Sequence, residues 1–77
     1  MKTLQILGTG CAKCTKLAEL TKTAADQLGL EYELVKITDI NEIIALGAMM
    51  TPGLAVDGTL KVSGRVPALD EIKRLIA

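Results

Sequence analysis

Two cysteines, Cys11 and Cys14, are the residues of this chain whose type and spacing could do chemistry. They are the only cysteines among 77 residues, and the chain has no histidine that could join them in a site. If Cys11 begins a helix, Cys14 lies on the same face three residues later, so the two sulfurs are close enough to bond. Such a pair can cycle between a dithiol and a disulfide, or it can bind a soft metal ion.

The place of Cys11 at the start of a helix would make its sulfur reactive. Unpaired N–H groups and a partial positive charge at a helix N-terminus favour an anion there. A thiolate is such an anion and is the reactive form of cysteine, so we expect the pKa of Cys11 to fall below that of an ordinary thiol. Lys13, between the two cysteines, is either a second cation that tunes this pKa or an ordinary solvated lysine.

The composition limits the classes of protein to which the chain can belong. Residues 1–77 are enough for a single domain near the lower size limit for folding without cross-links. Tyr32 is the one aromatic residue, so the core must be built from Leu, Ile, Val and Ala. Nine basic and nine acidic side chains cancel, and no basic stretch or aromatic platform supports a nucleic-acid partner. No apolar run approaches the length of a membrane span, so we expect no membrane partner.

The N-terminus predicts the compartment. Residues 1–4 begin a strand and lack the long apolar stretch and cleavage site of a signal peptide, which favours a cytoplasmic protein. Thiols are kept reduced there, so a cysteine pair is more often catalytic or metal-binding than structural. A structural disulfide across so short a loop would also add little, at most about 2 kcal/mol.

The elements that position the cysteines begin with a short apolar strand, residues 3–7. Gly8 and Gly10 would serve the tight turn from this strand into a helix from about Cys11 to Leu28. Apolar residues recur at helical spacing along that segment, and Gly29 would end the helix as a left-handed cap. The predicted buried stripe consists of Leu17, Leu20, Ala24 and Leu28.

The next segment predicts a strand and a short helix. Residues 31–37 read as a strand whose charges suit the edge of a sheet, which argues against open-ended pairing and favours a monomer. Asp39 with Glu42 three residues later resembles a capping box at a helix start. That helix would have Ile40, Ile43 and Ile44 on its apolar side and would end at Gly47.

The remaining residues predict a hairpin and a last helix. Residues 53–56 are nearly all apolar and read as a central strand, and Asp57-Gly58 is a two-residue hairpin signal before a partner strand at 59–63. Pro67 fits the first position of a helix. The buried stripe of that helix would be Leu69, Ile72 and Ile76. The order β-α-β-α-β-β-α predicts an α/β fold with one four-stranded mixed sheet, its first two strands parallel, and helices on both faces.

This arrangement resembles the thioredoxin-like fold in its small, glutaredoxin-sized form. The likeness rests on a strand, Cys-x-x-Cys at a helix start, and Thr51-Pro52 before a strand of a closing hairpin. More narrowly, Thr51-Pro52, Asp57-Gly58 and the segment 63–67 (Ser-Gly-Arg-Val-Pro) are similar to the small redox-active disulfide proteins of bacteria and archaea. The resemblance covers essentially the whole chain.

The resemblance implies a thiol–disulfide oxidoreductase and a role for each matching position. Cys11 would be the attacking thiol and Cys14 the resolving thiol. Pro52 would follow a cis peptide bond and lie against the disulfide, while Thr51 would offer backbone groups to an extended substrate. The implied partners are a protein disulfide and an upstream electron donor such as a reductase, and no cofactor or metal is required.

Several positions depart from the better-known members of this fold. Gly10 and the pair Ala12-Lys13 replace the Trp and the Gly-Pro of the Trp-Cys-Gly-Pro-Cys motif, and Gln5 stands where thioredoxins keep a buried Asp. The Cys-Pro-Tyr-Cys and Thr-Val-Pro elements of glutaredoxins do not occur. The resemblance therefore carries over neither a thioredoxin reductase partnership nor glutathione binding.

Two other functions remain open for the same residues. Two thiolates suit Cu(I), so a copper carrier is one alternative, although such carriers usually have Met where this chain has Thr9 and follow a β-α-β-β-α-β order. A domain that binds a partner through the segment 49–52, with redox-silent cysteines, is the other. Met49 and Met50 could serve as a soft contact surface or as copper ligands, but we expect them to pack beside the site, since Met fills gaps readily.

Overall fold

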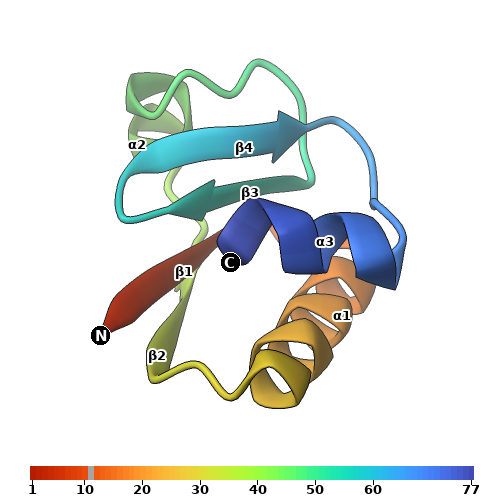
Figure 1. Cartoon of the computed structure of the whole chain (residues 1–77). Coiled ribbons are helices and arrows are strands. Elements are labelled where there is room, and N and C mark those ends of the chain that lie inside the picture. The colour runs from red at the N-terminus through yellow and green to blue at the C-terminus, as the bar shows by residue number, and fades with distance from the viewer. Residues whose placement is uncertain (11) are drawn as a thin grey trace.

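The computed structural model describes residues 1–10 and 12–77. Its elements follow the order β-α-β-α-β-β-α that the sequence predicts (Figure 1). In chain order they are β1 (Lys2–Leu7), α1 (Ala12–Leu28), β2 (Tyr32–Ile37), α2 (Ile40–Ala45), β3 (Gly53–Val56), β4 (Thr59–Ser63) and α3 (Leu69–Ile76). None of the helices in this described part of the chain combines the length and apolar character needed to cross a membrane.

The four strands form one mixed sheet in the order β2-β1-β3-β4. Strands β1 and β2 are parallel, with Leu4 opposite Leu34 and Leu7 opposite Ile37, whereas β3 is antiparallel to both β1 and β4. The charged strand β2 therefore lies at an edge and the fully buried β3 lies inside, as their side chains predict. The parallel pair needs a crossover, and α1 supplies it.

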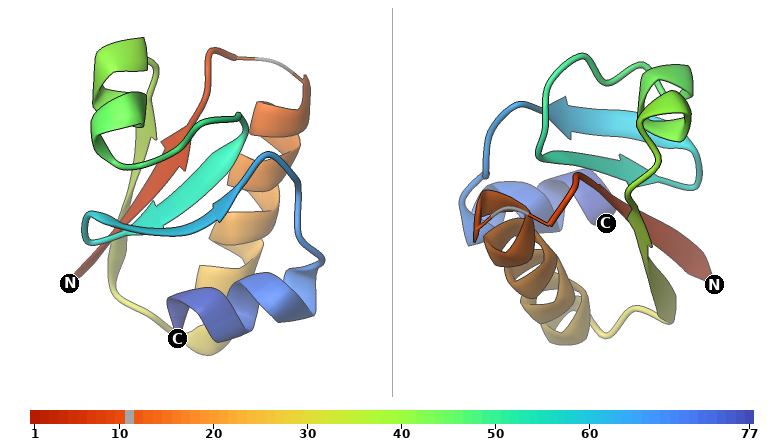
Figure 2. Two further views of the ribbon diagram at one scale, coloured as in Figure 1. Left: turned by 90° about the horizontal axis from the view of Figure 1, so that it is seen from above. Right: turned by 180° about the vertical axis from the view of Figure 1, so that it is seen from behind.

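The helices cover both faces of the sheet (Figure 2). Because side chains alternate along a strand, Leu4 and Ile6 of β1 point to one face and Leu7 points to the other. Helices α1 and α3 pack on the face of Leu4 and Ile6, whereas Ile43 of α2 packs with Leu7. This mixed sheet with helices on both faces is a thioredoxin-like α/β fold.

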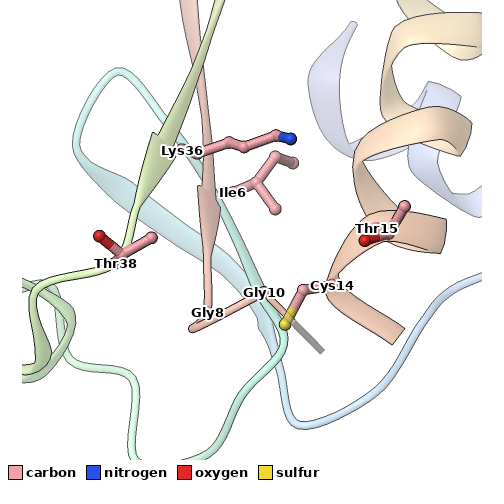
Figure 3. A pocket seen from close by; sticks show the side chains of 7 residues that line it. All are labelled: Ile6, Gly8, Gly10, Cys14, Thr15, Lys36 and Thr38. Carbon is pink, nitrogen blue, oxygen red and sulfur yellow. The ribbon is translucent and has the colours of Figure 1, made fainter. Parts of the chain in front are cut away.

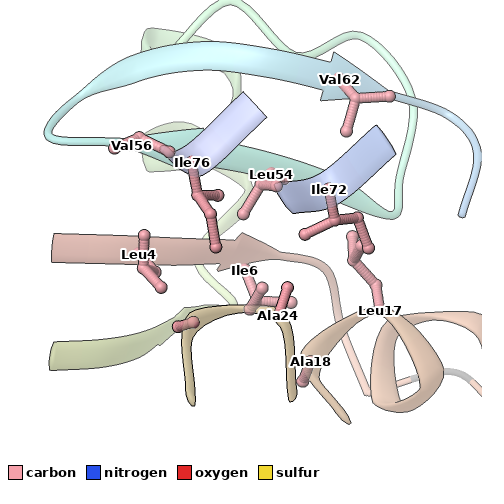
Figure 4. Packing of buried hydrophobic residues seen from close by; sticks show 11 residues of the cluster. Leu4, Ile6, Leu17, Ala18, Ala24, Leu54, Val56, Val62, Ile72 and Ile76 are labelled. Atoms are coloured by element: carbon pink, nitrogen blue, oxygen red, sulfur yellow. The ribbon is translucent and has the colours of Figure 1, made fainter. Parts of the chain in front are cut away.

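The main hydrophobic core lies between the sheet and the pair α1 and α3 (Figure 4). Its largest side chains are completely buried, and each contributes about 1.5–3 kcal/mol relative to an exposed position. They are Leu4, Leu17, Leu54, Ile72 and Ile76. As the composition requires, this core is aliphatic, with the ring of Tyr32 only partly buried at its edge.

Local signals set the turns as predicted. The Asp39 carboxylate accepts a hydrogen bond from the N–H of Asn41 (2.8 Å) and so caps α2. Asp57 and Gly58 both have positive φ (51° and 84°), as the tight hairpin between β3 and β4 requires. The Asp57 carboxylate also accepts from the N–H of Thr3 (2.8 Å), which ties the hairpin to β1.

Two details of the helices correct the sequence prediction. Leu28 is 39% exposed rather than buried, although it lies at helical spacing from the buried Leu17 and Ala24. Pro67 does not begin α3, which starts at Leu69 after an extended cap residue, Ala68. The Pro67 ring is fully buried instead, so it serves the connection between β4 and the helix.

Candidate functional site

Cys14 lies in the first turn of α1, beside the end of β1 at which the strand meets the helix. Its side chain is buried, with 5% of its surface exposed. Lys13, the preceding residue, is exposed. Cys11 lies outside the described residues, so its pairing with Cys14 and the tuning role of Lys13 stay predictions.

Gly8 brings the strand end into contact with the Cys14 sulfur. The N–H of Gly8 donates to the carbonyl of Ile37 (3.0 Å), which extends the parallel pairing of β1 and β2 by one residue. A Cβ atom on Gly8 would lie 2.2 Å from Cys14 Sγ. Gly8 and Gly10 both lie in the bend between β1 and α1, as the sequence predicts. Gly10 has a left-handed backbone (φ 88°), and Gly8 also makes room for the sulfur.

A small cavity of about 50 Å³ lies next to the Cys14 sulfur (Figure 3). Figure 3 shows the sulfur directed toward the Gly8 and Gly10 backbone, while Lys36 and Thr38 reach the cavity from the end of β2. The full lining is Ile6, Gly8, Gly10, Cys14, Thr15, Lys36 and Thr38. The volume suits a water molecule rather than an organic cofactor.

Lys36 and Thr38 were not predicted as cavity residues from the sequence, although a signal for them existed. Both lie at the carboxyl end of the strand that runs parallel to β1, and the carboxyl ends of parallel strands meet at one edge of a sheet, where α/β proteins commonly place their sites.

The peptide bond between Thr51 and Pro52 is cis, which confirms what the resemblance implies. Pro52 is fully buried and Thr51 is exposed. Thr51 Cβ lies 3.9 Å from the point where a Gly8 Cβ would stand, so Thr51 borders the contact between Gly8 and Cys14. The structure thus brings Cys14 and the segment around Pro52 together, although they lie far apart along the chain.

Strand β4 holds this segment in place. The N–H of Gly64 donates to the carbonyl of Pro52 (2.8 Å), and the Ser63 hydroxyl donates to the carbonyl of Met50 (3.0 Å). Main-chain groups on both sides of Thr51 are therefore fixed by the turn after β4.

An apolar groove of about 610 Å³ runs from Thr51 along α2. Ile40 and Ile44 are 60% and 62% exposed, and Met49 and Met50 are 95% and 66% exposed. The prediction that both methionines pack beside the site is therefore wrong, and two of the three isoleucines on the predicted apolar side of α2 are exposed. A six-residue helix over one end of the sheet can bury only one row of side chains, which is that of Ile43.

The other predicted polar positions have structural partners. The Gln5 side chain, where thioredoxins keep an Asp, accepts from the N–H of Gly58 (2.8 Å) and joins β1 to the hairpin. Both terminal nitrogens of the Arg65 guanidinium donate to the Glu71 carboxylate. These hydrogen bonds lower the pKa of Glu71 and raise that of Arg65.

Metal ligands do not gather in the described part of the chain, which contains no group of three or more His, Cys, Asp or Glu side chains able to hold an ion. A resident zinc site of the usual four N and S ligands has no support there.

Comparisons with known proteins agree with this geometry. Residues 2–77 match the family model described as a thioredoxin domain. A thioredoxin of Methanothermobacter thermautotrophicus is 43% identical over 77 residues, which is the full length of both chains. A thioredoxin of Methanocaldococcus jannaschii is 44% identical over 73 residues, 95% of this chain and 84% of that protein. The chain therefore belongs to the thioredoxin family, a family of thiol–disulfide oxidoreductases.

Proposed function

We propose that this chain is a small cytoplasmic thiol–disulfide oxidoreductase that uses Cys11 and Cys14, with residues 1–77 acting as one domain and without a cofactor. The observation that carries the proposal is the buried Cys14 sulfur at the start of α1, beside Gly8 and near Thr51, in a chain of the thioredoxin family. The Cys-x-x-Cys spacing supplies the second sulfur.

The reaction begins with the Cys11 thiolate and a disulfide of a protein substrate. Attack forms a bond between Cys11 and one substrate sulfur, and the other substrate sulfur leaves as a thiolate that takes up a proton. Cys14, as its thiolate, then attacks the Cys11 sulfur and releases the first substrate sulfur. The substrate has gained two electrons, the chain holds a disulfide between Cys11 and Cys14, and an upstream dithiol donor such as a reductase resets it.

The burial of Cys14 supports this division of roles. With 5% of its surface exposed, Cys14 is out of reach for a disulfide on another protein, whereas an intramolecular attack needs no such access. Cys11 is then the sulfur that meets the substrate.

The substrate would bind along the exposed Thr51 and the apolar groove beside it. Main-chain groups of Thr51 would pair with an extended substrate segment, while the buried Pro52 shapes the floor of the site. The exposed Met49 and Met50 supply adaptable apolar contact for substrates of different sequence.

Two cysteine variants test the proposal. In an insulin-type disulfide reduction assay with dithiothreitol as donor, Cys11→Ala should abolish turnover. Reduced Cys14→Ala, freed of dithiothreitol and then mixed with the disulfide substrate, should accumulate a mixed disulfide that mass spectrometry detects. Undiminished turnover by Cys11→Ala would sink the assignment. A second measurement equilibrates the parent chain in metal-free redox buffers and follows the disulfide between Cys11 and Cys14. A reversible two-electron couple supports the proposal, and if no intramolecular disulfide forms, a Cu(I) carrier becomes the better interpretation.

A second candidate function, partner binding through residues 49–52 with redox-silent cysteines, is favoured by the high exposure of Met49 and Met50. The double variant Cys11→Ala/Cys14→Ala separates it from the first. Full retention of the chain's biological activity in this variant would support binding alone, and loss of that activity would support thiol exchange.

A further inference from the structure

We infer that Gly8 is a positioning residue that fixes where the Cys14 sulfur lies during thiol exchange. The inference rests on the proposed function and adds a residue that the Cys-x-x-Cys motif does not contain. Its basis is the contact at the end of β1, where a Cβ atom on Gly8 would stand 2.2 Å from Cys14 Sγ and 3.2 Å from Cys14 Cβ. Non-bonded carbon and sulfur atoms do not approach to 2.2 Å, so any other residue at position 8 must displace the sulfur.

The main chain at Gly8 cannot easily move to relieve such a contact. The residue is buried, and its N–H is hydrogen-bonded to the Ile37 carbonyl (3.0 Å), which keeps it in the sheet. Thr51 Cβ, 3.9 Å from the same point, limits movement toward the Pro52 segment. The displacement therefore falls on Cys14.

Cys14 can respond by rotating about its single side-chain torsion. A methyl group at position 8 would exclude the observed direction of Sγ and leave the other staggered rotamers. The distance of 3.2 Å to Cys14 Cβ is tight but needs only a small adjustment. The absence of a side chain on Gly8 thus permits the observed direction of the sulfur, which a Cβ atom at position 8 would block.

This direction matters most in the resolving step. There the Cys14 thiolate forms a bond to the Cys11 sulfur while the bond from Cys11 to the substrate sulfur breaks, and the substrate sulfur leaves with the electron pair. Displacement at sulfur depends on the alignment of the attacking atom, and small misplacements of reacting groups cost large factors in rate. The first step uses Cys11 alone and should be less sensitive.

The kinetic test compares Gly8→Ala with the parent chain in stopped-flow reactions with a protein disulfide. We expect the mixed disulfide to decay at least tenfold more slowly, while its formation stays within twofold of the parent rate. A variant in the far end of α3, Ile76→Val, controls for a general loss of stability and should leave both rates unchanged. Decay in Gly8→Ala within twofold of the parent rate would overturn the inference.

A double-mutant cycle tests the contact itself, independently of activity. Gly8→Ala should lower the denaturation midpoint of the parent chain, and in a Cys14→Ala background, which lacks Sγ, this decrease should be at least halved. A Gly8→Ala chain that folds only together with Cys14→Ala also supports the inference. An equal decrease in both backgrounds, or no folding in either, overturns it. If the parent chain exchanges no disulfides at all, the proposed function fails while the cycle still reports on the contact.

Discussion

The two faces of the sheet differ in how completely they are covered. On the face of α1 and α3, the described residues include a continuous cluster of eleven buried side chains, five of which are the large aliphatic groups shown in the core. On the face of α2, the buried cluster of described residues contains only Leu7, Ile43 and Ala48. The large apolar side chains next to it remain exposed. One face therefore contains most of the buried core, and the other carries the groove to which we assign the substrate.

The largest expected change is in the free energy of unfolding, and it comes from the face covered by α1 and α3. Ile72→Ala should lower the free energy of unfolding by about 3 kcal/mol, because Ile72 is completely buried between α3, α1 and the sheet and its removal leaves a cavity. Urea denaturation followed by circular dichroism measures the change. Ile44→Ala on α2 is the control and should change stability by less than about 0.5 kcal/mol, since Ile44 is largely exposed. Equal losses in the two variants would break the comparison.

The second-largest expected effect is on the KM for a protein disulfide substrate. Ile44→Ser should raise the KM for a protein disulfide about fivefold, because the groove loses apolar contact area. Turnover of a small-molecule disulfide, which does not extend along α2, should stay unchanged. Kinetics with both substrates provide the measurement, with Leu28→Ser as a control, since this exposed apolar residue lies at the far end of α1. A parallel loss with both substrates would show that the groove does not bind the protein partner.

The third prediction concerns the stability of α2, which packs on a small buried cluster. Asp39→Ala should cost about 1 kcal/mol, because the side-chain cap on the N–H of Asn41 is lost. Hydrogen exchange should show faster opening of α2 while the amides of α1 keep their protection. Glu42→Ala, in the same helical turn, is the control and should cost less. Uniform acceleration across both helices would mean that the two faces unfold as one unit.

The smallest effect lies on the surface where α1 meets β2. Lys22 and the Tyr32 hydroxyl both donate to the Asp26 carboxylate (2.9 Å each), and these hydrogen bonds, that from Lys22 above all, lower the pKa of Asp26 below its ordinary 3.8. A lowered folded-state pKa stabilises the fold at pH values above 3.8, and this contribution disappears as the pH falls through the lowered value. An NMR titration of the Asp26 carboxyl carbon should show its pKa rising in Lys22→Gln. An unchanged titration would show that the pair does not persist in water.

Cys14 lies where these two regions meet, and this position explains its environment. It sits on the buried face of α1, yet its sulfur is directed to the strand end at Gly8, near Thr51 and the start of the groove. The well-covered face holds α1, the helix that carries the sulfur, in place. The substrate would bind on the less covered face. Thiol exchange benefits from both, because the attacking atom must be held and its partner must be admitted.

The sequence by itself determined the order of the elements, the edge place of β2, the inner place of β3 and the turns at Asp39 and Asp57-Gly58. These features depend on local periodicity, capping and turn chemistry, all of which act over a few residues. The Cys-x-x-Cys spacing likewise depends on one helical turn, and it identified the candidate chemistry without any tertiary information.

Only the tertiary structure decided the roles of Gly8, of the cavity residue Lys36 and of the exposed Ile44. Each depends on a segment distant in the chain: Gly8 faces a sulfur on the next helix, Lys36 reaches the site from the neighbouring strand, and Ile44 has no partner in the described chain that covers it. Spacing along a sequence shows which side chains share a face, but burial depends on what packs against that face. For the same reason Leu28, in phase with a buried stripe, can be 39% exposed.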